Sequence, residues 1–223
     1  MIDLRSGPID LSHPIESGMT TYPGLPAPLV AEHLSRDASA ERYAAGTTFS
    51  IARIEMVANT GTYLDAPFHR FVEGEDVAAL PLGRLAAIPG VLVDARGKGP
   101  ALGPDLFESV SVENRAVLVW TGWDAHWRTP EYGSGAHPFL TREASAHLAA
   151  GPAALVGIDS LNIDDVRDLT RPAHTLLLAA GIPIVEHLTN LASVGSAPFL
   201  FFAVPAPVRG MGSFPVRAFA IGT

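Results

Sequence analysis

The densest group of side chains that could do chemistry lies between Asn59 and His69, in the run N-T-G-T-Y-L-D-A-P-F-H. Asp65 and His69 are four residues apart in this run. A carboxylate and an imidazole at that spacing can converge on one site, although such pairs also serve in turns and at the surface. Gly61 and Pro67 interrupt the run, which indicates a strand end leading into a constrained loop, where binding groups concentrate.

Other polar residues stand in apolar surroundings further along the chain. Glu186 ends the run I-P-I-V-E, and because a lone buried charge is costly, we expect it at a strand end, where α/β proteins place ligands. His174 begins H-T-L-L-L-A-A, a setting typical of a hydrogen-bonded core histidine. His187 follows Glu186 and should point to the opposite face, as a packing residue. We expect turn hydrogen bonds from Asp164 and a surface position for His137.

Short apolar runs flanked by Gly or Pro predict the strands that must position these groups. The predicted strands cover residues 50–58, 91–94, 116–120, 154–158, 182–185, 200–204 and 216–221. One helix is predicted from Thr141, its cap, to a left-handed Gly151, and a second over 174–180, closed by Gly181. Because strands and helices alternate, the sequence predicts an α/β fold with a mixed β-sheet flanked by helices.

Composition narrows the domain count and the classes of function. The chain of 223 residues is 48% hydrophobic and 17% charged, which predicts a single domain over 1–223 with a sizeable core. Residues 20–48, rich in Pro, Gly, Ala and Ser, should form an irregular arm. That arm could cover a neighbouring subunit or the active site, and the sequence leaves both open.

Charge and cysteine content exclude several partners and sites. A net charge of −8 with scattered basic residues argues against nucleic acid and anionic membranes as partners. The chain has no cysteine, which excludes disulfides, a thiolate zinc site and a Cys nucleophile. The first residues lack a signal-peptide pattern, and the apolar stretch 197–207 falls short of the roughly 20 residues that span a bilayer. We therefore expect a cytoplasmic protein that acts on a small molecule.

The run from Asn59 to His69 resembles the pattern H-x-G-T-H-x-D-x-P-x-H of the cyclase superfamily, which includes bacterial kynurenine formamidases. Gly61, Thr62, Asp65, Pro67 and His69 match at the same spacing. Further similar blocks follow in the family's order, with D-L-S-H-P-I and Y-P-G near the start, then V-L-V-W-T-G-W-D, G-I-D-S-L-N-I-D, G-I-P-I-V-E-H-L-T-N-L and P-V-R-A-F-A. The resemblance thus covers nearly the whole chain.

The resemblance implies a fold, an assembly and roles for particular residues. It implies the family's swivelling β/β/α architecture and a homodimer or homotetramer in which the N-terminal arm is exchanged between subunits. It places Asp65, His174 and Glu186 on metal-binding positions and His69 on the histidine of acid–base chemistry. Such oxygen and nitrogen donors suit zinc or manganese, and three protein ligands leave a position for water.

Two positions depart from the family pattern. The first and second histidines of the motif are Asn59 and Tyr63 here. An amide is a poor zinc ligand, and a phenol must lose a proton with a pKa of about 10 before it binds a metal well. The remaining residues could therefore hold one divalent metal, or none.

Three functions follow, in order of preference. The first is a hydrolase that opens an amide, lactam or related C–N or C–O bond of a small, aromatic substrate. In it Asp65, His174 and Glu186 hold the metal, His69 protonates the leaving group, and Tyr63 or Asn59 binds the developing oxyanion. The second is a metal-independent cyclase, dehydratase or isomerase that uses His69, Asp65 and Glu186 for acid–base chemistry with Tyr63 as a proton donor. The third is a non-catalytic binding protein on the same fold.

Overall fold

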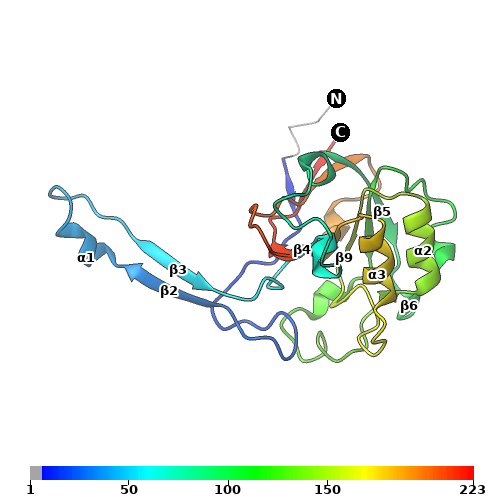
Figure 1. Cartoon of the computed structure of the whole chain (residues 1–223), viewed down its shortest axis with the longest axis horizontal. Coiled ribbons are helices and arrows are strands. Elements are labelled where there is room, and N and C mark those ends of the chain that lie inside the picture. The colour runs from blue at the N-terminus through cyan, green and yellow to red at the C-terminus, as the bar shows by residue number, and fades with distance from the viewer. Residues whose placement is uncertain (1–6) are drawn as a thin grey trace.

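The structure, a computed structural model, describes residues 7–223 and is built on a mixed β-sheet (Figure 1). The strands of this sheet are β1 (Ile9–Asp10), β4 (Tyr63–Asp65), β5 (Ile88–Asp94), β7 (Ala116–Trp120), β9 (Leu155–Ile158), β10 (Ile184–Glu186), β11 (Phe199–Phe202), β12 (Ser213–Pro215) and β13 (Phe219–Gly222). Within the described residues, their order is β1-β13-β11-β5-β7-β9-β10-β4-β12. The central strands β5, β7, β9 and β10 are parallel, and the flanking strands are antiparallel. The predicted α/β fold with a mixed sheet is confirmed.

The predicted central strands are present, with bounds that differ by a few residues, as strand ends commonly do. Only the second half of the segment predicted as a strand at 216–221 lies in a strand, because β12 ends before it, at Pro215, and β13 begins at Phe219. Smaller elements complete the connections: the parallel pair β6 (Ala101–Leu102) and β8 (Phe139–Leu140), and the 3-10 turns η1 (Pro67–His69), η2 (Leu82–Arg84), η3 (Pro104–Leu106), η4 (Trp123–His126) and η5 (Leu191–Ser193).

Two helices, α2 (Arg142–Ala150) and α3 (Pro172–Ala179), pack beside each other against the sheet (Figure 1). The hydroxyl of Thr141 accepts a hydrogen bond from the backbone N–H of Ala144, so the predicted cap is confirmed. The left-handed end at Gly151 is wrong, because its φ is −80°. The predicted end of α3 at Gly181 is confirmed, with φ of 71° at that glycine.

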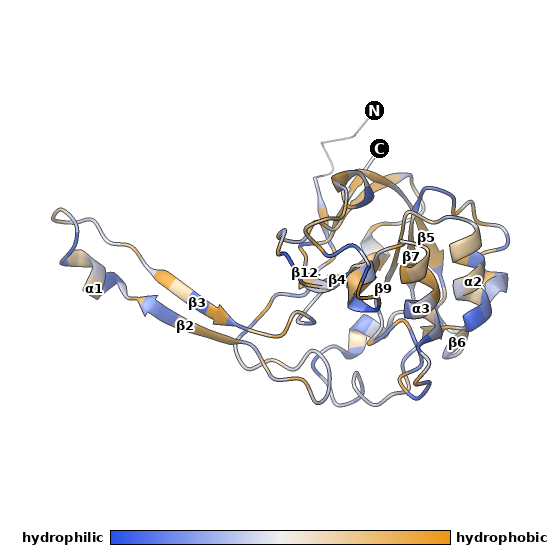
Figure 2. Ribbon diagram, viewed as in Figure 1, coloured by the Kyte–Doolittle hydropathy of each residue, from blue (hydrophilic) through white to orange (hydrophobic). Residues whose placement is uncertain are grey.

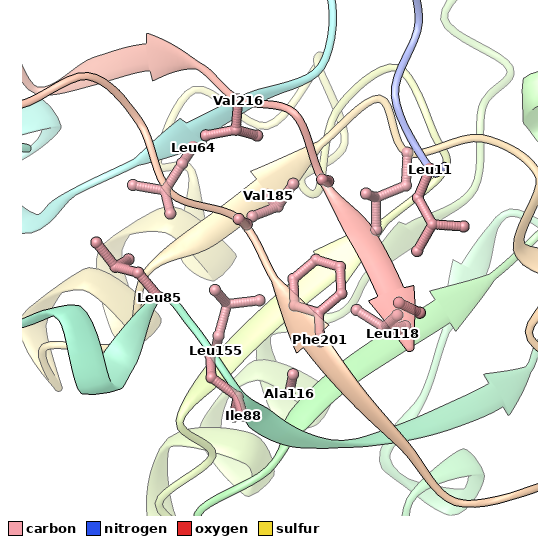
Figure 3. Packing of buried hydrophobic residues seen from close by; sticks show 14 of the residues in the cluster. Leu11, Leu64, Leu85, Ile88, Ala116, Leu118, Leu155, Val185, Phe201 and Val216 are labelled. Carbon is pink, nitrogen blue, oxygen red and sulfur yellow. The ribbon is translucent and has the colours of Figure 1, made fainter. Parts of the chain in front are cut away.

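The central strands are buried on both faces, as parallel strands covered on both sides must be. Along β7, Val117 and Val119 point into the cluster beneath α2 and α3, whereas Leu118 points into a second cluster on the other face. That second cluster also holds Leu64 of β4 and Phe201 of β11, which come from opposite parts of the sheet (Figure 3). The sheet therefore curls around it.

Residues 20–55 contain a hairpin that extends away from the main body (Figure 1). Strands β2 (Leu29–Leu34) and β3 (Ile51–Glu55) pair antiparallel, and the short helix α1 (Arg36–Ala40) lies between them. The prediction of a wholly irregular arm at 20–48 is wrong, because Val and Leu in this stretch pair with the strand predicted at 50–58. That strand is the shorter β3, it belongs to the hairpin, and all its residues are exposed.

Among residues 7–223, no helix combines the length and the apolar composition needed to cross a membrane.

We expect Leu118→Ala to lower the free energy of unfolding by about 2–5 kcal/mol, because it removes a fully buried side chain from a core that can collapse only in part. Leu82→Ala makes the same chemical change at a side chain that is 66% exposed and should shift the value by less than about 0.5 kcal/mol. Denaturant unfolding of both variants measures the difference. Equal losses would contradict the placement of Leu118 in the core.

Candidate functional site

Three adjacent strands bring the candidate residues together. Strand β4 lies between β10 and β12, with Tyr63 opposite Glu186, and Asp65 opposite both Ile184 and Ser213. The turn η1 follows β4 directly and carries His69 at its end. Asp65 and Glu186 therefore lie on one face of the sheet because of strand register, although they are far apart in sequence.

The segment before β4 turns at Gly61, one of the two residues that interrupt the run in the sequence. Gly61 has φ of 66°, in the left-handed region, and a Cβ there would lie 3.1 Å from Cγ1 of Ile15. The chain thus turns at Gly61 instead of running extended from Asn59. Asn59 and Tyr63 nevertheless both line the pocket, and Nδ2 of Asn59 lies 3.5 Å from Oδ1 of Asp65.

His174 lies at the centre of the acidic groups. Its Nε2 is 3.7 Å from Oδ2 of Asp65 and 3.9 Å from Oε1 of Glu186, so the structure brings the three predicted metal ligands together. Among the described residues, Asp65, His69 and His174 also form a group whose ligand atoms all lie within 4.8 Å of one another. Asp65 and His174 belong to both sets, which differ in their third member, Glu186 or His69.

Asp164 fixes the orientation of His174, a role that the sequence prediction missed. Its Oδ2 lies 2.7 Å from Nδ1 of His174, and its two oxygens accept hydrogen bonds from the N–H groups of Ala173 and His174 at the start of α3. These bonds join residues that are nine or ten positions apart, so no short sequence motif indicates them. The predicted turn role of Asp164 is therefore incomplete. Nε2 of His174 is left to face Asp65, which is the arrangement that a carboxylate imposes on metal-binding histidines.

Ser213, also absent from the prediction, links Asp65 to His69. Its hydroxyl donates a short hydrogen bond to Oδ1 of Asp65 and lies 2.9 Å from Nδ1 of His69. Because the single hydroxyl proton goes to Asp65, Nδ1 of His69 must be the donor to Ser213. Nε2 of His69 then carries the free lone pair. The neighbouring Gly212 packs on this histidine, since a Cβ there would lie 2.4 Å from Cα of His69.

Tyr63 occupies a motif-histidine position and binds Glu186. Its hydroxyl donates to Oε2 of Glu186 at 2.5 Å, and Oε1 of the same carboxylate accepts the N–H of Ile163 at 2.6 Å. Burial, with the charges of Glu186 and Asp65, raises the pKa of Tyr63 well above 10, so the side chain remains a neutral phenol. In this arrangement the phenol proton is committed to Glu186.

Electrostatics within the cluster favour a cation. Burial would raise the pKa of Asp65, but the imidazoles of His174 and His69 outweigh it and hold that pKa below its usual value. Burial would lower the pKa of His174, but its contacts with Asp164 and Asp65 and the charge of Glu186 raise it to about 10. Burial raises the pKa of Glu186 to about 7. Several buried carboxylates thus surround one imidazolium.

The donors fit a divalent metal. Oδ2 of Asp65 is buried and accepts no hydrogen bond from residues 7–223, yet it faces Nε2 of His174 across 3.7 Å. That separation is too long for a hydrogen bond. A carboxylate oxygen and an imidazole nitrogen that face each other without bonding form two ligands for a metal such as zinc or manganese.

The pocket has a volume of about 330 Å³. It is lined by Tyr22, Leu25, Asn59, Tyr63, His69, Arg70, Asn162, Arg171, His174 and Glu186. Its size and mixed lining suit a small organic molecule.

Two other histidines lie outside this pocket. His187 is fully buried and its Nδ1 bonds the Tyr132 hydroxyl at 2.7 Å, so the predicted packing role is confirmed. The predicted surface position of His137 is wrong. Its side chain is fully buried, and Nε2 lies 3.0 Å from the carbonyl oxygen of Asp164, where it supports the loop that holds His174.

In protein freed of metal by chelation, we expect stability to fall as the pH rises from about 6.5 to about 10. The pKa of His174 is raised from 6.5 in the unfolded chain to about 10 in the folded state, so protonation stabilises the fold. The stabilisation by the protonated His174 is fully present below pH 6.5, the pKa in the unfolded chain, and is lost as the pH rises through about 10, the pKa in the folded state. Thermal unfolding across this range should show the decline in wild type and in a control, His33→Gln, in the exposed β2. A decline that persists unchanged in His174→Gln would contradict the assignment.

Comparisons with known proteins agree with this geometry. Kynurenine formamidase of Bacillus cytotoxicus is 26% identical over 215 residues, which cover 94% of this chain and 95% of that protein. A structure described as a potential metal-dependent hydrolase with cyclase activity has a TM-score of 0.79 at 25% identity, covering 97% of this chain and 98% of its own.

A third protein shows the same fold. Isatin hydrolase A of Labrenzia aggregata, bound to benzyl benzoate, has a TM-score of 0.83 at 22% identity and covers 99% of this chain and 96% of its own. The model of the Cyclase family matches residues 9–165, which hold all the strands from β1 to β9 and the motif around Asp65. This chain therefore belongs to the Cyclase family.

Proposed function

We propose that this chain is a hydrolase that opens an amide, lactam or related bond of a small, aromatic substrate with the help of one divalent metal, zinc or manganese. The observation that carries the proposal is the pair formed by Oδ2 of Asp65 and Nε2 of His174, which face each other at 3.7 Å without bonding. His69 lies beside them on the same pocket. This combination supplies a metal site and a proton-transfer group at one place.

The metal would be held by Asp65, His174 and Glu186. Held there, it would lower the pKa of a bound water towards neutrality and supply hydroxide. Tyr63 donates to Oε2 of Glu186, so the ion would contact Oε1, which lies 3.9 Å from Nε2 of His174 and also accepts the N–H of Ile163. Asp164 keeps Nε2 of His174 in position.

Proton transfer falls to His69. Ser213 holds its Nδ1, so Nε2 takes a proton from the attacking water and returns it to the leaving nitrogen as the C–N bond breaks. The side chain is 37% exposed, which gives it access to substrate. Since the Tyr63 proton is used by Glu186, the developing oxyanion would be bound by the amide of Asn59, whose Nδ2 makes only long contacts, 3.5 Å to Asp65 and 3.4 Å to Ser213.

The relatives support a hydrolase of this class. Kynurenine formamidases match over nearly their full length. By their name they act on a formamide, whose hydrolysis breaks a C–N bond. Two solved structures of at least 25% identity are described as a potential and a predicted metal-dependent hydrolase. The replacement of two motif histidines by Asn59 and Tyr63 argues for a substrate or a metal number different from theirs.

A metal-independent cyclase, dehydratase or isomerase is the second candidate. The bond from Tyr63 to Glu186 favours it, because a carboxyl group with a pKa of about 7 can hold or release a proton at neutral pH. Metal content and chelation separate the two candidates.

We expect Asp65→Ala to lose metal and activity together, because it removes the one oxygen without a hydrogen bond among residues 7–223 that faces His174. His69→Ala should keep the metal and the fold but lower turnover by about 10²–10⁴-fold. Elemental analysis and hydrolysis of N-formyl aromatic amides measure the two effects. Asp105→Ala, at an exposed residue outside the site, is the control.

Each alternative has its own signature in these measurements. Metal that is lost in His69→Ala and kept in Glu186→Gln would make His69 the third ligand. Full activity of Asp65→Ala in the presence of a strong chelator would contradict the metal mechanism. A continued requirement for His69 would then support the metal-independent enzyme.

We further propose that a second copy of this chain covers the β2–β3 hairpin, in a homodimer or homotetramer. The register places Val30 opposite Ile54, and these side chains are 44% and 50% exposed. Hydrophobic residues make up much of β3 and the part of β2 nearer the main body (Figure 2). An isolated two-stranded hairpin is marginal in water, so this one needs a surface to pack against.

Ile54→Lys should lower the mass of the assembly measured by light scattering, because it places a charge in the apolar surface of the hairpin. Val72→Lys adds the same charge at a residue that is 79% exposed outside the hairpin and should leave the mass unchanged. A wild-type protein that is monomeric at all concentrations would contradict the proposal.

A further inference from the structure

Two arginines line the mouth of the pocket, and no catalytic role has been given to them. Arg70 follows His69 at the end of η1, and Arg171 immediately precedes α3. Both belong to the lining of the 330 Å³ pocket that holds His69 and His174. They add two permanent positive charges to a cavity whose inner end is acidic.

Neither of these two arginines forms an ion pair with a carboxylate among the described residues. Arg96, Arg128, Arg167 and Arg217 each form an ion pair with a carboxylate at 2.6–2.9 Å. Among residues 7–223, no carboxylate lies within ion-pair distance of Arg70 or Arg171. Their charges are therefore available to an incoming anion.

The hydrogen bonds that these guanidinium groups do make are long, and Arg70 also lies over the ring of Phe71, 5.3 Å from its centre. Nη1 of Arg171 lies 3.4 Å from Oδ1 of Asn162, which also lines the pocket, and Nε of Arg70 lies 3.4 Å from the Thr175 hydroxyl on α3. Each arginine thus keeps most of its N–H donors free. Both side chains are held near the first turn of α3, beside His174.

The backbone at Arg171 supports a role for its side chain. Its φ and ψ are 47° and 62°, in the left-handed region that Gly or Asn adopts far more readily than a long side chain does. The next residue is Pro172, which further restricts Arg171. Strained positions of this kind concentrate at ligand sites, where the side chain is needed in spite of the strain.

We propose that Arg70 and Arg171 form an anion subsite that selects substrates carrying a carboxylate. This inference rests on the proposed function in one respect, namely that the substrate also contains the amide bond that is hydrolysed. The substrate carboxylate binds to the two arginines through the paired N–H···O hydrogen bonds that guanidinium groups favour. The bond to be broken then lies next to His69 and His174. Tyr22 and Leu25 on the same pocket provide an apolar wall for the body of the substrate.

Binding of benzoate, with benzyl alcohol as its neutral counterpart, tests the subsite without any turnover. We expect wild-type protein to bind benzoate more tightly than benzyl alcohol in calorimetry. Arg171→Asn should weaken benzoate binding by about tenfold or more, since a charged hydrogen bond is lost at a half-buried residue. Arg70→Gln, at an exposed residue, should weaken it by about threefold. Neither change should affect benzyl alcohol.

The choice of variants separates binding from folding and from net charge. Arg171→Asn suits the left-handed backbone, so its thermal unfolding should equal or exceed that of wild type. Arg167→Gln removes an equal charge from the same loop, at a residue that is 73% exposed, paired with Asp165 and outside the pocket lining. It should bind benzoate as wild type does.

A pair of substrates links the subsite to turnover. N-formylanthranilate and formanilide differ only in the carboxylate, and the arginine variants should raise KM for the first while leaving kcat, and the second substrate, unchanged. Benzoate affinity that is equal in wild type and both variants, or absent from wild type, overturns the subsite. Loss of benzoate binding in the variants, with no hydrolysis of either formamide by wild type, upholds the subsite and counts against the proposed hydrolase.

Discussion

The buried carboxylate of Asp65 is the constraint on which the rest of the site depends. A lone carboxylate removed from water would be too costly, so the surrounding elements supply positive charge and hydrogen bonds. Ser213 donates to one oxygen, and the other faces the imidazole of His174. A divalent metal between Asp65 and His174 would complete this balance, which is why the same residues serve stability and chemistry.

The curled sheet makes this arrangement rigid. Strand β4 is pinned between β10 and β12, so the positions of Asp65, Glu186 and Ser213 follow from one register. A slip of one residue would turn Asp65 into the core and Leu64 into the pocket. The apolar cluster that contains Leu64 opposes such a slip, and core packing therefore defines the geometry of the site.

Tyr63, which replaces a motif histidine, keeps a polar side chain at this position but changes its role. The phenol stays neutral and holds Glu186 by a hydrogen bond, where a histidine would offer a metal ligand. Asn59 occupies the other changed position, so the side of the pocket next to β4 carries two hydrogen-bonding side chains where the family pattern has two histidines. The remaining donors, on the side of His174, would hold the one metal that we propose. The two arginines at the mouth extend the pocket beyond the reacting centre.

Local pattern was enough to predict the central strands and the two helices, and the resemblance to the cyclase superfamily indicated Asp65, His69, His174 and Glu186 as site residues. Apolar runs predicted the central strands because a buried parallel strand must be apolar throughout, and the motif from Gly61 to His69 indicated the family. The first strand of the hairpin, β2, was missed because it is short and mostly exposed, so no clear burial pattern marks it, whereas β3 was predicted as a strand but not as part of a hairpin.

Only the tertiary structure revealed which side chains hold the reactive ones. Asp164 bonds His174, Ser213 bonds both Asp65 and His69, and His137 supports Asp164, over separations that range from ten to 148 residues. Such contacts depend on strand order and loop path, which leave no trace in residue spacing. The sequence by itself determined the donor types and the sheet, because both follow from residue chemistry and periodicity. Their distances, protonation and supporting bonds were decided by the packing of segments that are remote along the chain.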